Sequence, residues 1–167
     1  INDLKLDFLE FQLLTPKESE LSDDKIIMFR DILEYDALYS IKTEKLDEFE
    51  RAMAQLKCYY FRETNLPPSD LMPLLLAIHL VAILGRKDQN KDKFVDFNIE
   101  LQLARRYTQG DNEFLDYAAD LHQSVIENSF ARLFLLENQP PSPLFNQFTA
   151  GLLNGARNSH ADSIERA

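Results

Sequence analysis

The stretch FERAMAQLKCYYF, from Phe49 to Phe61, decides the fold of this chain. Its apolar side chains recur at the spacing of one face of an α-helix: Phe49, Met53, Leu56 and Tyr60, with Ala52 and Tyr59 at the margins. The polar side chains take the other side: Glu50, Arg51, Gln55 and Lys57. One wide apolar face and one charged face predict a helix that packs on its neighbours and exposes its back to water.

The composition of the whole chain favours helices throughout. Its 167 residues fit a single domain, and a chain of this length buries about two thirds of the surface that its unfolded form exposes. Four glycines against twelve phenylalanines argue against a turn-rich β architecture. We therefore expect one all-α domain over residues 1–167, with no β-sheet.

The formal net charge of -10 bears on the partners of the chain. A negative protein repels phosphate backbones and anionic lipids, so binding to nucleic acid or to a membrane surface lacks electrostatic support. The longest apolar run, Leu71 to Leu84, contains Pro73 and His79 and is shorter than the ~20 residues that span a bilayer. This run predicts a helix that is apolar on all sides and central in the fold.

Cys58 is the only cysteine, which excludes a disulfide within the chain. A single cysteine is typical of a reducing compartment such as the cytosol or the nucleus. Because Cys58 follows Lys57 on an amphipathic helix, we expect a buried structural thiol rather than a nucleophile.

Turn and capping residues divide the rest of the chain into further helices. We expect them in these segments: Ile1 to Leu14, a long stripe from Ile26 to Ile41, Phe94 to Gly110, Phe114 to Ile126, Ser129 to Leu136, and a last helix from Leu144 that is interrupted near Gly151 and Gly155. Asp70 is expected to cap the helix from Leu71 to Leu84, and Gly85 to end it in the left-handed conformation.

A degenerate repeat runs through these helices. Three of them open with a short polar residue followed early by a phenylalanine, at Phe49, Phe94 and Phe130. These phenylalanines are about 45 and about 36 residues apart, within the repeat lengths of about 34 to 47 residues that helical-hairpin solenoids show. The spacing predicts a right-handed, TPR-like array of helical hairpins. A bundle without repeat geometry is the alternative, since only this one element recurs.

The sequence contains no recognised motif for catalysis or metal binding. It has no glycine-rich phosphate loop, zinc-type cysteine and histidine spacing, metalloprotease helix or serine nucleophile elbow. The three histidines, His79, His122 and His160, lie in separate segments, and His79 is expected to be a hydrogen-bonded core residue. We therefore expect no catalytic, metal-binding or cofactor-binding residues.

The aromatic end of the opening stretch allows two interpretations. Tyr59, Tyr60 and Phe61 would suit a stacking platform for bases or for a proline-rich ligand. Three consecutive aromatics point in three directions on a helix, however, so core filling is favoured.

The same stretch resembles a family signature. Phe49-Glu50-Arg51 and the run from Met53 to Phe61 are similar to the signature of the PCI-domain, non-ATPase subunits of the 26S proteasome lid. Further segments support the resemblance: Arg30 to Glu34, Ala37 to Ile41, Phe97 to Leu101 and Glu127 to Phe134. On this resemblance, the structural signature helix comprises Phe49, Met53, Leu56, Tyr59, Tyr60 and Phe61.

The resemblance implies both an architecture and a role. Members of this family carry helical repeats followed by a winged helix, which we expect beyond residue 167. The implied role is that of a non-catalytic scaffold subunit of the lid, acting in ubiquitin-dependent protein degradation in the cytoplasm and nucleus. The implied partners are other PCI subunits of the lid, no cofactor is implied, and no interface residue can be named.

Other functions remain open at this point. A PCI subunit of the COP9 signalosome or of translation initiation factor 3 would share the fold, although the run from Met53 to Phe61 favours the proteasome. From other classes, the alternatives are a free-standing helical adaptor for a peptide and an enzyme with an unrecognised site. The adaptor requires an open apolar groove, and the enzyme a cleft with convergent titratable groups.

Overall fold

The computed structural model of the chain describes residues 23–61, 67–86, 93–108 and 112–153. Within these ranges every regular element is helical, and no strand occurs. The elements are α2 (Asp23–Lys42), α3 (Leu46–Tyr60), α4 (Met72–Gly85), α5 (Lys93–Tyr107), α6 (Glu113–Ile126), α7 (Phe130–Asn138), the 3-10 turn η2 (Pro143–Phe145), and a helix over 146–153. The expected all-α class is confirmed, and the helix expected over Ile1 to Leu14 lies outside the described residues.

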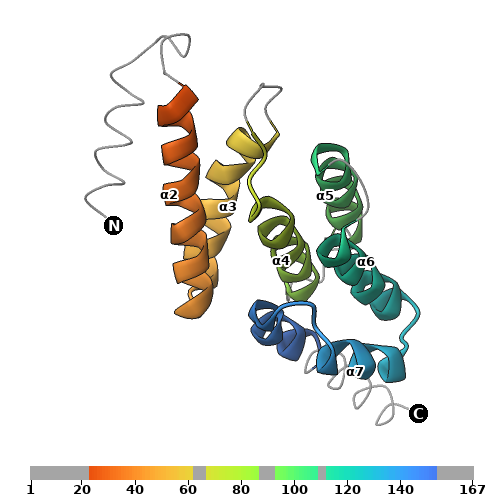
Figure 1. The fold of residues 1–167 in the computed structure, drawn as a ribbon. Coiled ribbons are helices and arrows are strands. Elements are labelled where there is room, and N and C mark those ends of the chain that lie inside the picture. The colour runs from red at the N-terminus through yellow and green to blue at the C-terminus, as the bar shows by residue number, and fades with distance from the viewer. Residues whose placement is uncertain (1–22, 62–66, 87–92, 109–111, 154–167) are drawn as a thin grey trace.

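The helices pack as successive hairpins along an array. Contacts join α2 to α3, α4 to α5 and α6 to α7, and α4 also packs against α6. Figure 1 shows the array running from α2 at one edge to α5 and α6 at the other, with α7 crossing its lower end. The recurring phenylalanines Phe49, Phe94 and Phe130 all lie near the start of the second helix of a hairpin. The repeat read from the sequence therefore corresponds to a structural unit.

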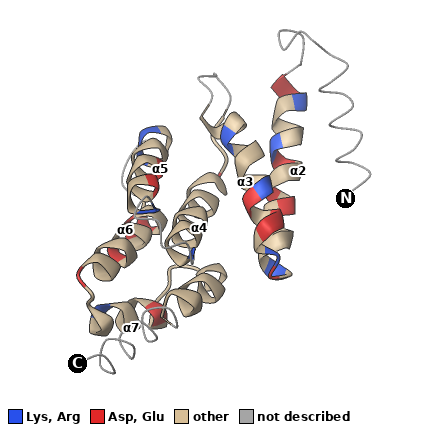
Figure 2. Ribbon diagram, turned by 180° about the vertical axis from the view of Figure 1, so that it is seen from behind, with Lys and Arg blue, Asp and Glu red and all other residues tan. Residues whose placement is uncertain are grey.

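The central helix is α4, as its composition predicts. Eleven of its residues are buried, and it contacts α3, α5, α6 and η2. It contains no Asp, Glu, Lys or Arg, so it is tan in Figure 2, where it lies between the charged helices α3 and α5. None of the helices in the described ranges has the length and apolarity that crossing a membrane would require.

The end of the described chain returns to the middle of the array. Phe145 is fully buried, with its ring centroid 5.0 Å from that of Tyr117 on α6. Phe148 lies 5.8 Å from Phe49 on α3, ring to ring. The hydroxyl of Tyr117 donates a hydrogen bond to the carbonyl of Leu136 at 2.9 Å, which ties α6 to α7. These aromatic contacts give the array a shared core instead of a row of independent hairpins.

Three local expectations were wrong. Asp70 does not cap α4; Ser69 accepts a hydrogen bond from the backbone N–H of Leu71, which is the N-cap residue. Gly85 is the last residue of α4 and has no positive φ, because the chain leaves the helix through Arg86 in an extended conformation. Gly151 lies inside the continuous helix over 146–153, while Gly155 is outside the described residues.

The left-handed positions are instead Glu44 and Asn128, with φ of 56° and 51°. Each follows a helix, and each lies in a turn closed by backbone hydrogen bonds, such as Lys45 N–H to the Ser40 carbonyl at 3.0 Å. Asparagine tolerates this conformation, whereas a glutamate meets a steric penalty from its Cβ.

Glu44→Gly is therefore expected to stabilise the protein by about 0.5–1 kcal/mol, because relief of the left-handed strain exceeds the entropy that glycine loses on folding. Urea unfolding of the variant and the parent measures this difference. Asn128→Gly is the matched control and should gain less. A destabilised Glu44→Gly protein would contradict the assignment of strain to this residue.

Candidate functional site

The signature helix α3 places its apolar side chains inward. Phe49, Met53 and Leu56 are fully buried, and Tyr60 is nearly so. Arg51 and Gln55 are exposed, whereas Glu50 and Lys57 are half-buried. The 3.6-residue period of the sequence thus separates the buried face of α3 from its outer face as expected.

The three aromatics at the end of this helix contact different neighbours. Tyr60 turns toward α2, and Phe61 packs on Tyr107 of α5 with ring centroids 5.1 Å apart. Tyr59 is half-buried against the core. Since the rings do not share a surface, they do not form a stacking platform, and core filling is the better description of this cluster.

Tyr60 belongs to a buried polar network that the sequence did not reveal. Its hydroxyl donates a hydrogen bond of 2.8 Å to Oε1 of Glu34, a carboxylate that is almost completely buried on α2. Arg30 lies beside the same carboxylate, with Nε 3.9 Å from Oε1, and forms a closer ion pair with Asp31 at 3.1 Å. Burial, followed by the neighbouring Glu34 charge, raises the pKa of Tyr60 far above its ordinary value.

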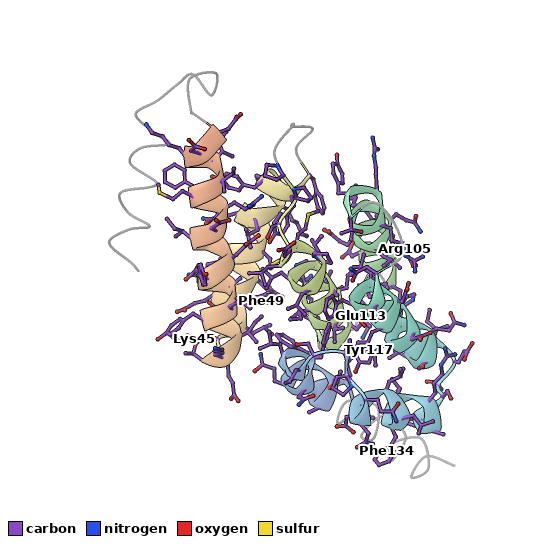
Figure 3. The ribbon with its side chains drawn as sticks, in the orientation of Figure 1. Lys45, Phe49, Arg105, Glu113, Tyr117 and Phe134 are labelled. Carbon is purple, nitrogen blue, oxygen red and sulfur yellow. The ribbon has the colours of Figure 1, made fainter. Side chains whose placement is uncertain are left out.

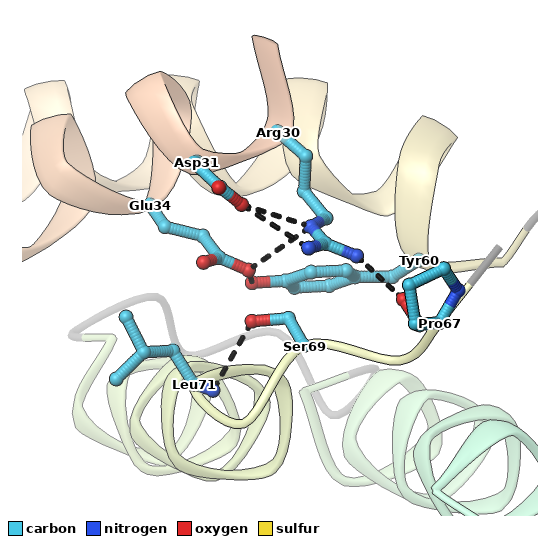
Figure 4. Close-up of polar contacts among 7 residues, drawn as sticks. All are labelled: Arg30, Asp31, Glu34, Tyr60, Pro67, Ser69 and Leu71. Carbon is cyan, nitrogen blue, oxygen red and sulfur yellow. Dashed lines mark hydrogen bonds and ion pairs between the residues drawn. The ribbon is translucent and has the colours of Figure 1, made fainter. Parts of the chain in front are cut away.

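The network joins three separate segments of the chain (Figure 4). Arg30 also donates to the backbone carbonyl of Pro67 at 2.8 Å, so one guanidinium links α2 to the segment that leads into α4. Glu34 lies three residues before Ala37 and seven before Ile41, on the buried stripe of α2, but a glutamate at this position does not by itself indicate burial. The network thus connects α2 to α3 and to the segment before α4.

Cys58 is exposed, contrary to the expectation of a buried thiol. Its residue type suggested burial, but its position lies on the side of α3 opposite Phe49, Met53 and Leu56. The Sγ atom is 3.8 Å from the carbonyl oxygen of Ala54 in the preceding turn. The helical period was the better guide than the amino-acid type.

A charged groove of about 370 Å³ lies between α3 and α5, over the C-terminal half of α4. We call it the α3–α5 groove. Its charged and polar lining consists of Glu50, Lys57, His79, Arg86, Asp96 and Glu100. Two ion pairs border it, one between Lys57 and Glu100 and one between Arg86 and Glu50 at 3.1 Å. Ala54, Ile83 and Ile99 supply apolar surface.

His79 lies at the base of this groove and is 7% exposed. Burial, together with the charges of Lys57 and Arg86, lowers the pKa of His79 to about 3, so the imidazole is neutral near pH 7. The side chain is a core residue as expected, but the described part of the chain offers it no hydrogen-bond partner. The expectation of a hydrogen-bonded histidine was therefore only half right.

The lowered pKa of His79 predicts a loss of stability on acidification. The unfolded chain, with a histidine pKa near 6.5, binds more protons than the folded chain between pH 6.5 and about 3, so stability falls as pH falls through this window. At pH 5 the free energy of unfolding is expected to be about 2 kcal/mol lower than at a pH where His79 is neutral in both the folded and the unfolded chain. Urea unfolding at pH 7 and pH 5 measures it. In His79→Gln the side chain cannot titrate, so the free energy of unfolding should fall less on acidification, by about the same 2 kcal/mol. Equal pH dependence of the variant and the parent would contradict the lowered pKa of His79.

Of the other two histidines, only His122 lies within the described ranges. His122 is stacked on Phe97 at 4.2 Å between ring centroids, and burial lowers its pKa. His160 lies outside the described residues. Within the described ranges, no cluster of three or more histidine, cysteine, aspartate or glutamate side chains is arranged to hold a metal ion.

Comparison with known proteins identifies the family of this chain. Residues 70–167, from just before α4 onward, match the model of the CSN8/PSMD8/EIF3K family. The chain belongs to this family. The matched range begins after α3, so the signature helix of this CSN8/PSMD8/EIF3K member lies outside it.

Individual relatives cover the first hairpin as well. The chain is 29% identical to the 26S proteasome non-ATPase regulatory subunit 8 homolog A of Arabidopsis thaliana, over 100% of the chain and 61% of the relative. It is 28% identical to the 26S proteasome regulatory subunit RPN12 of Saccharomyces cerevisiae, over 97% of the chain and 60% of the relative. It is 25% identical to the 26S proteasome non-ATPase regulatory subunit 8 of Caenorhabditis elegans, over 89% of the chain and 57% of the relative. The chain thus spans about three fifths of the length of these relatives.

Several apolar side chains of this family member lie on its outer surface. Tyr35 and Tyr39 project from α2, and Phe134 and Leu135 from α7, as Figure 3 shows for Phe134 at the lower edge of the array. A second pocket of about 370 Å³ opens between the α2–α3 turn and the helix over 146–153, with Phe49 and Phe148 in its lining. The pocket adjoins the C-terminal end of α2, whereas Phe134 and Leu135 lie on α7.

Proposed function

We propose that this protein is a non-catalytic scaffold subunit of the lid of the 26S proteasome regulatory particle, acting in ubiquitin-dependent protein degradation. The observation that carries this proposal is the agreement among four relatives from a plant, two yeasts and a nematode, each of which is named as a regulatory subunit of the 26S proteasome. A lid subunit works by holding other subunits in place, so its function resides in surfaces instead of a reactive centre.

The shape of the chain suits such a role. An array of hairpins exposes helix faces and turns along its length, and these are the surfaces by which repeat proteins contact partners. The exposed tyrosines lie on α2 at one edge of the array, and the exposed Phe134 and Leu135 lie on α7, which crosses its lower end. Large apolar side chains on a surface are a common feature of protein interfaces.

The proposal extends to the remaining properties of the protein. Its partners are other PCI subunits of the lid, in a hetero-oligomeric complex of the cytoplasm and nucleus, with no cofactor, nucleic acid or membrane. Residues 1–167 act as one helical-repeat domain, and the winged helix of the PCI module follows residue 167. In the α3–α5 groove, the ion pairs of Lys57 with Glu100 and of Arg86 with Glu50 engage four of the charged groups, which leaves fewer groups for acid–base chemistry.

The nearest alternative is a subunit of the COP9 signalosome or of translation initiation factor 3. The description of the matched family includes names from outside the proteasome, so the family alone does not decide between them. The names of the individual relatives favour the proteasome.

Affinity purification distinguishes these assignments. The full-length gene product that contains this chain, with an affinity tag, is isolated from a native lysate of its own cells, and co-purifying proteins are quantified by mass spectrometry. We expect the lid and base subunits of the regulatory particle in equal amounts, and none with the tag alone. Recovery of signalosome or initiation-factor subunits would replace the proteasome assignment, and absence of any stable partner would overturn the scaffold role.

A further inference from the structure

The α3–α5 groove is formed by two parallel helices that face each other across α4. Lys57 of α3 pairs with Glu100 of α5, and one turn further along Phe61 of α3 packs on Tyr107 of α5. These contacts close one end of the space between the helices. Between these contacts and the ion pair of Arg86 with Glu50, the groove is lined by Ala54 on α3 and by Asp96 and Ile99 on α5. The groove is therefore a cleft bordered by two ion pairs, with an exposed carboxylate in its lining.

His79 marks the base of this cleft as a place for a ligand. The side chain lines the cleft and is only 7% exposed. The described residues provide no hydrogen bond to either ring nitrogen. The ring nitrogens of His79 are not among the fully buried atoms that lack a partner, so a molecule in the cleft can reach them and supply hydrogen bonds. A neutral imidazole offers one donor and one acceptor nitrogen.

The charges of the cleft select a cation. Its lining holds three carboxylates, Glu50, Asp96 and Glu100, against the two cations Lys57 and Arg86. Both cations are paired with glutamates, whereas Asp96 has no ion-pair partner within the described ranges. The neutral state of His79 adds no positive charge. An anion would have to displace Glu50 or Glu100 from an existing ion pair, but a cation meets an unpaired carboxylate.

We propose that the α3–α5 groove binds an arginine side chain of a partner polypeptide, with the guanidinium donating to the Asp96 carboxylate and to the imidazole of His79. The aliphatic part of that arginine packs on Ile83 and Ile99, and Ile99 is among the exposed apolar residues of α5. The proposal goes beyond membership of a complex, because it names the residue type by which a partner is recognised.

Arginine fits this cleft better than lysine does. Its planar fork of donors reaches two acceptors at once, whereas an ammonium is a single strongly hydrated point charge. The guanidinium is also more weakly hydrated, so it enters a partly buried site at a lower desolvation cost.

The test uses the purified chain and a defined probe. N-acetyl-arginine amide is titrated into the 15N-labelled protein while the imidazole nitrogens of His79 are followed by NMR. We expect saturable shifts centred on His79, Asp96 and Ile99, with a dissociation constant in the millimolar range typical of so small a ligand. N-acetyl-citrulline amide has nearly the same shape without the charge and should bind at least about tenfold more weakly.

Two variants test whether the arginine probe binds in the α3–α5 groove. Asp96→Asn should weaken binding of the arginine probe about tenfold, because it removes the charge from an exposed residue that the fold does not need. Asp24→Asn removes the same charge from α2, outside the cleft, and should change nothing. Equal binding of the citrulline probe, binding of N-acetyl-glutamate amide in preference to arginine, or no response of His79 would each overturn the proposal. None of these outcomes depends on the proteasome assignment.

Discussion

Leu56→Ala is expected to lower the free energy of unfolding by about 2–5 kcal/mol. Leu56 is fully buried at the centre of the inward face of α3 and belongs to the shared hydrophobic core. Removing most of its side chain forfeits the transfer free energy of the buried methyl groups and leaves a cavity that the rigid helices around α4 cannot close. Chemical denaturation followed by circular dichroism measures the change.

The neighbouring residue provides the control for this substitution. Gln55→Ala changes the side chain one position away on the exposed face of the same helix, so it should alter stability by less than about 0.5 kcal/mol. Both variants change a residue to alanine, which keeps helix propensity high in each case. Similar midpoints for the two variants would mean that the inward face of α3 is assigned incorrectly.

Glu34→Ala should cost about 3 kcal/mol, near the lower end of the range for breaking a buried ion pair. The substitution leaves the Tyr60 hydroxyl buried without its acceptor and deprives Arg30 of one of two carboxylates. Arg30 keeps its ion pair with Asp31, which is why the lower end applies. Asp31→Ala is the matched control: its side chain is 48% exposed, and the expected loss is below about 1 kcal/mol.

A double-mutant cycle isolates the contact between Glu34 and Tyr60. Tyr60→Phe and Glu34→Gln each weaken one partner while preserving most of the side-chain volume. Residues that share a buried hydrogen bond show interaction free energies of about 0.5–3 kcal/mol, so the double variant should lose less than the two single losses combined. Strict additivity of the two losses would show that the hydrogen bond between the hydroxyl and the carboxylate contributes nothing.

The periodic features of the sequence were the reliable ones. The apolar stripes predicted α2 through α7 to within a few residues, because a helix that lies on a core must place apolar side chains every three to four positions. The all-apolar run predicted the central position of α4, since only neighbours on every side can cover such a helix. The recurring Phe49, Phe94 and Phe130 identified the second helix of each hairpin.

Arguments from single residue types were less reliable. Cysteine is usually buried, yet Cys58 is exposed because the helical period turns it away from the core. Glycine commonly ends helices in the left-handed conformation, yet Glu44 and Asn128 occupy that conformation here and Gly85 does not. Such preferences are small free energies that the packing of neighbouring helices overrides.

By itself the sequence determined the helical class, the order of the helices and the faces that they bury, because these depend on the local spacing of apolar side chains along one segment. Only the tertiary structure decided that Glu34 is buried against Tyr60, that Arg30 reaches the carbonyl of Pro67, and that His79 lies beneath the α3–α5 groove. These arrangements join residues far apart in the chain. The relative placement of whole helices sets them, and no single segment encodes that placement.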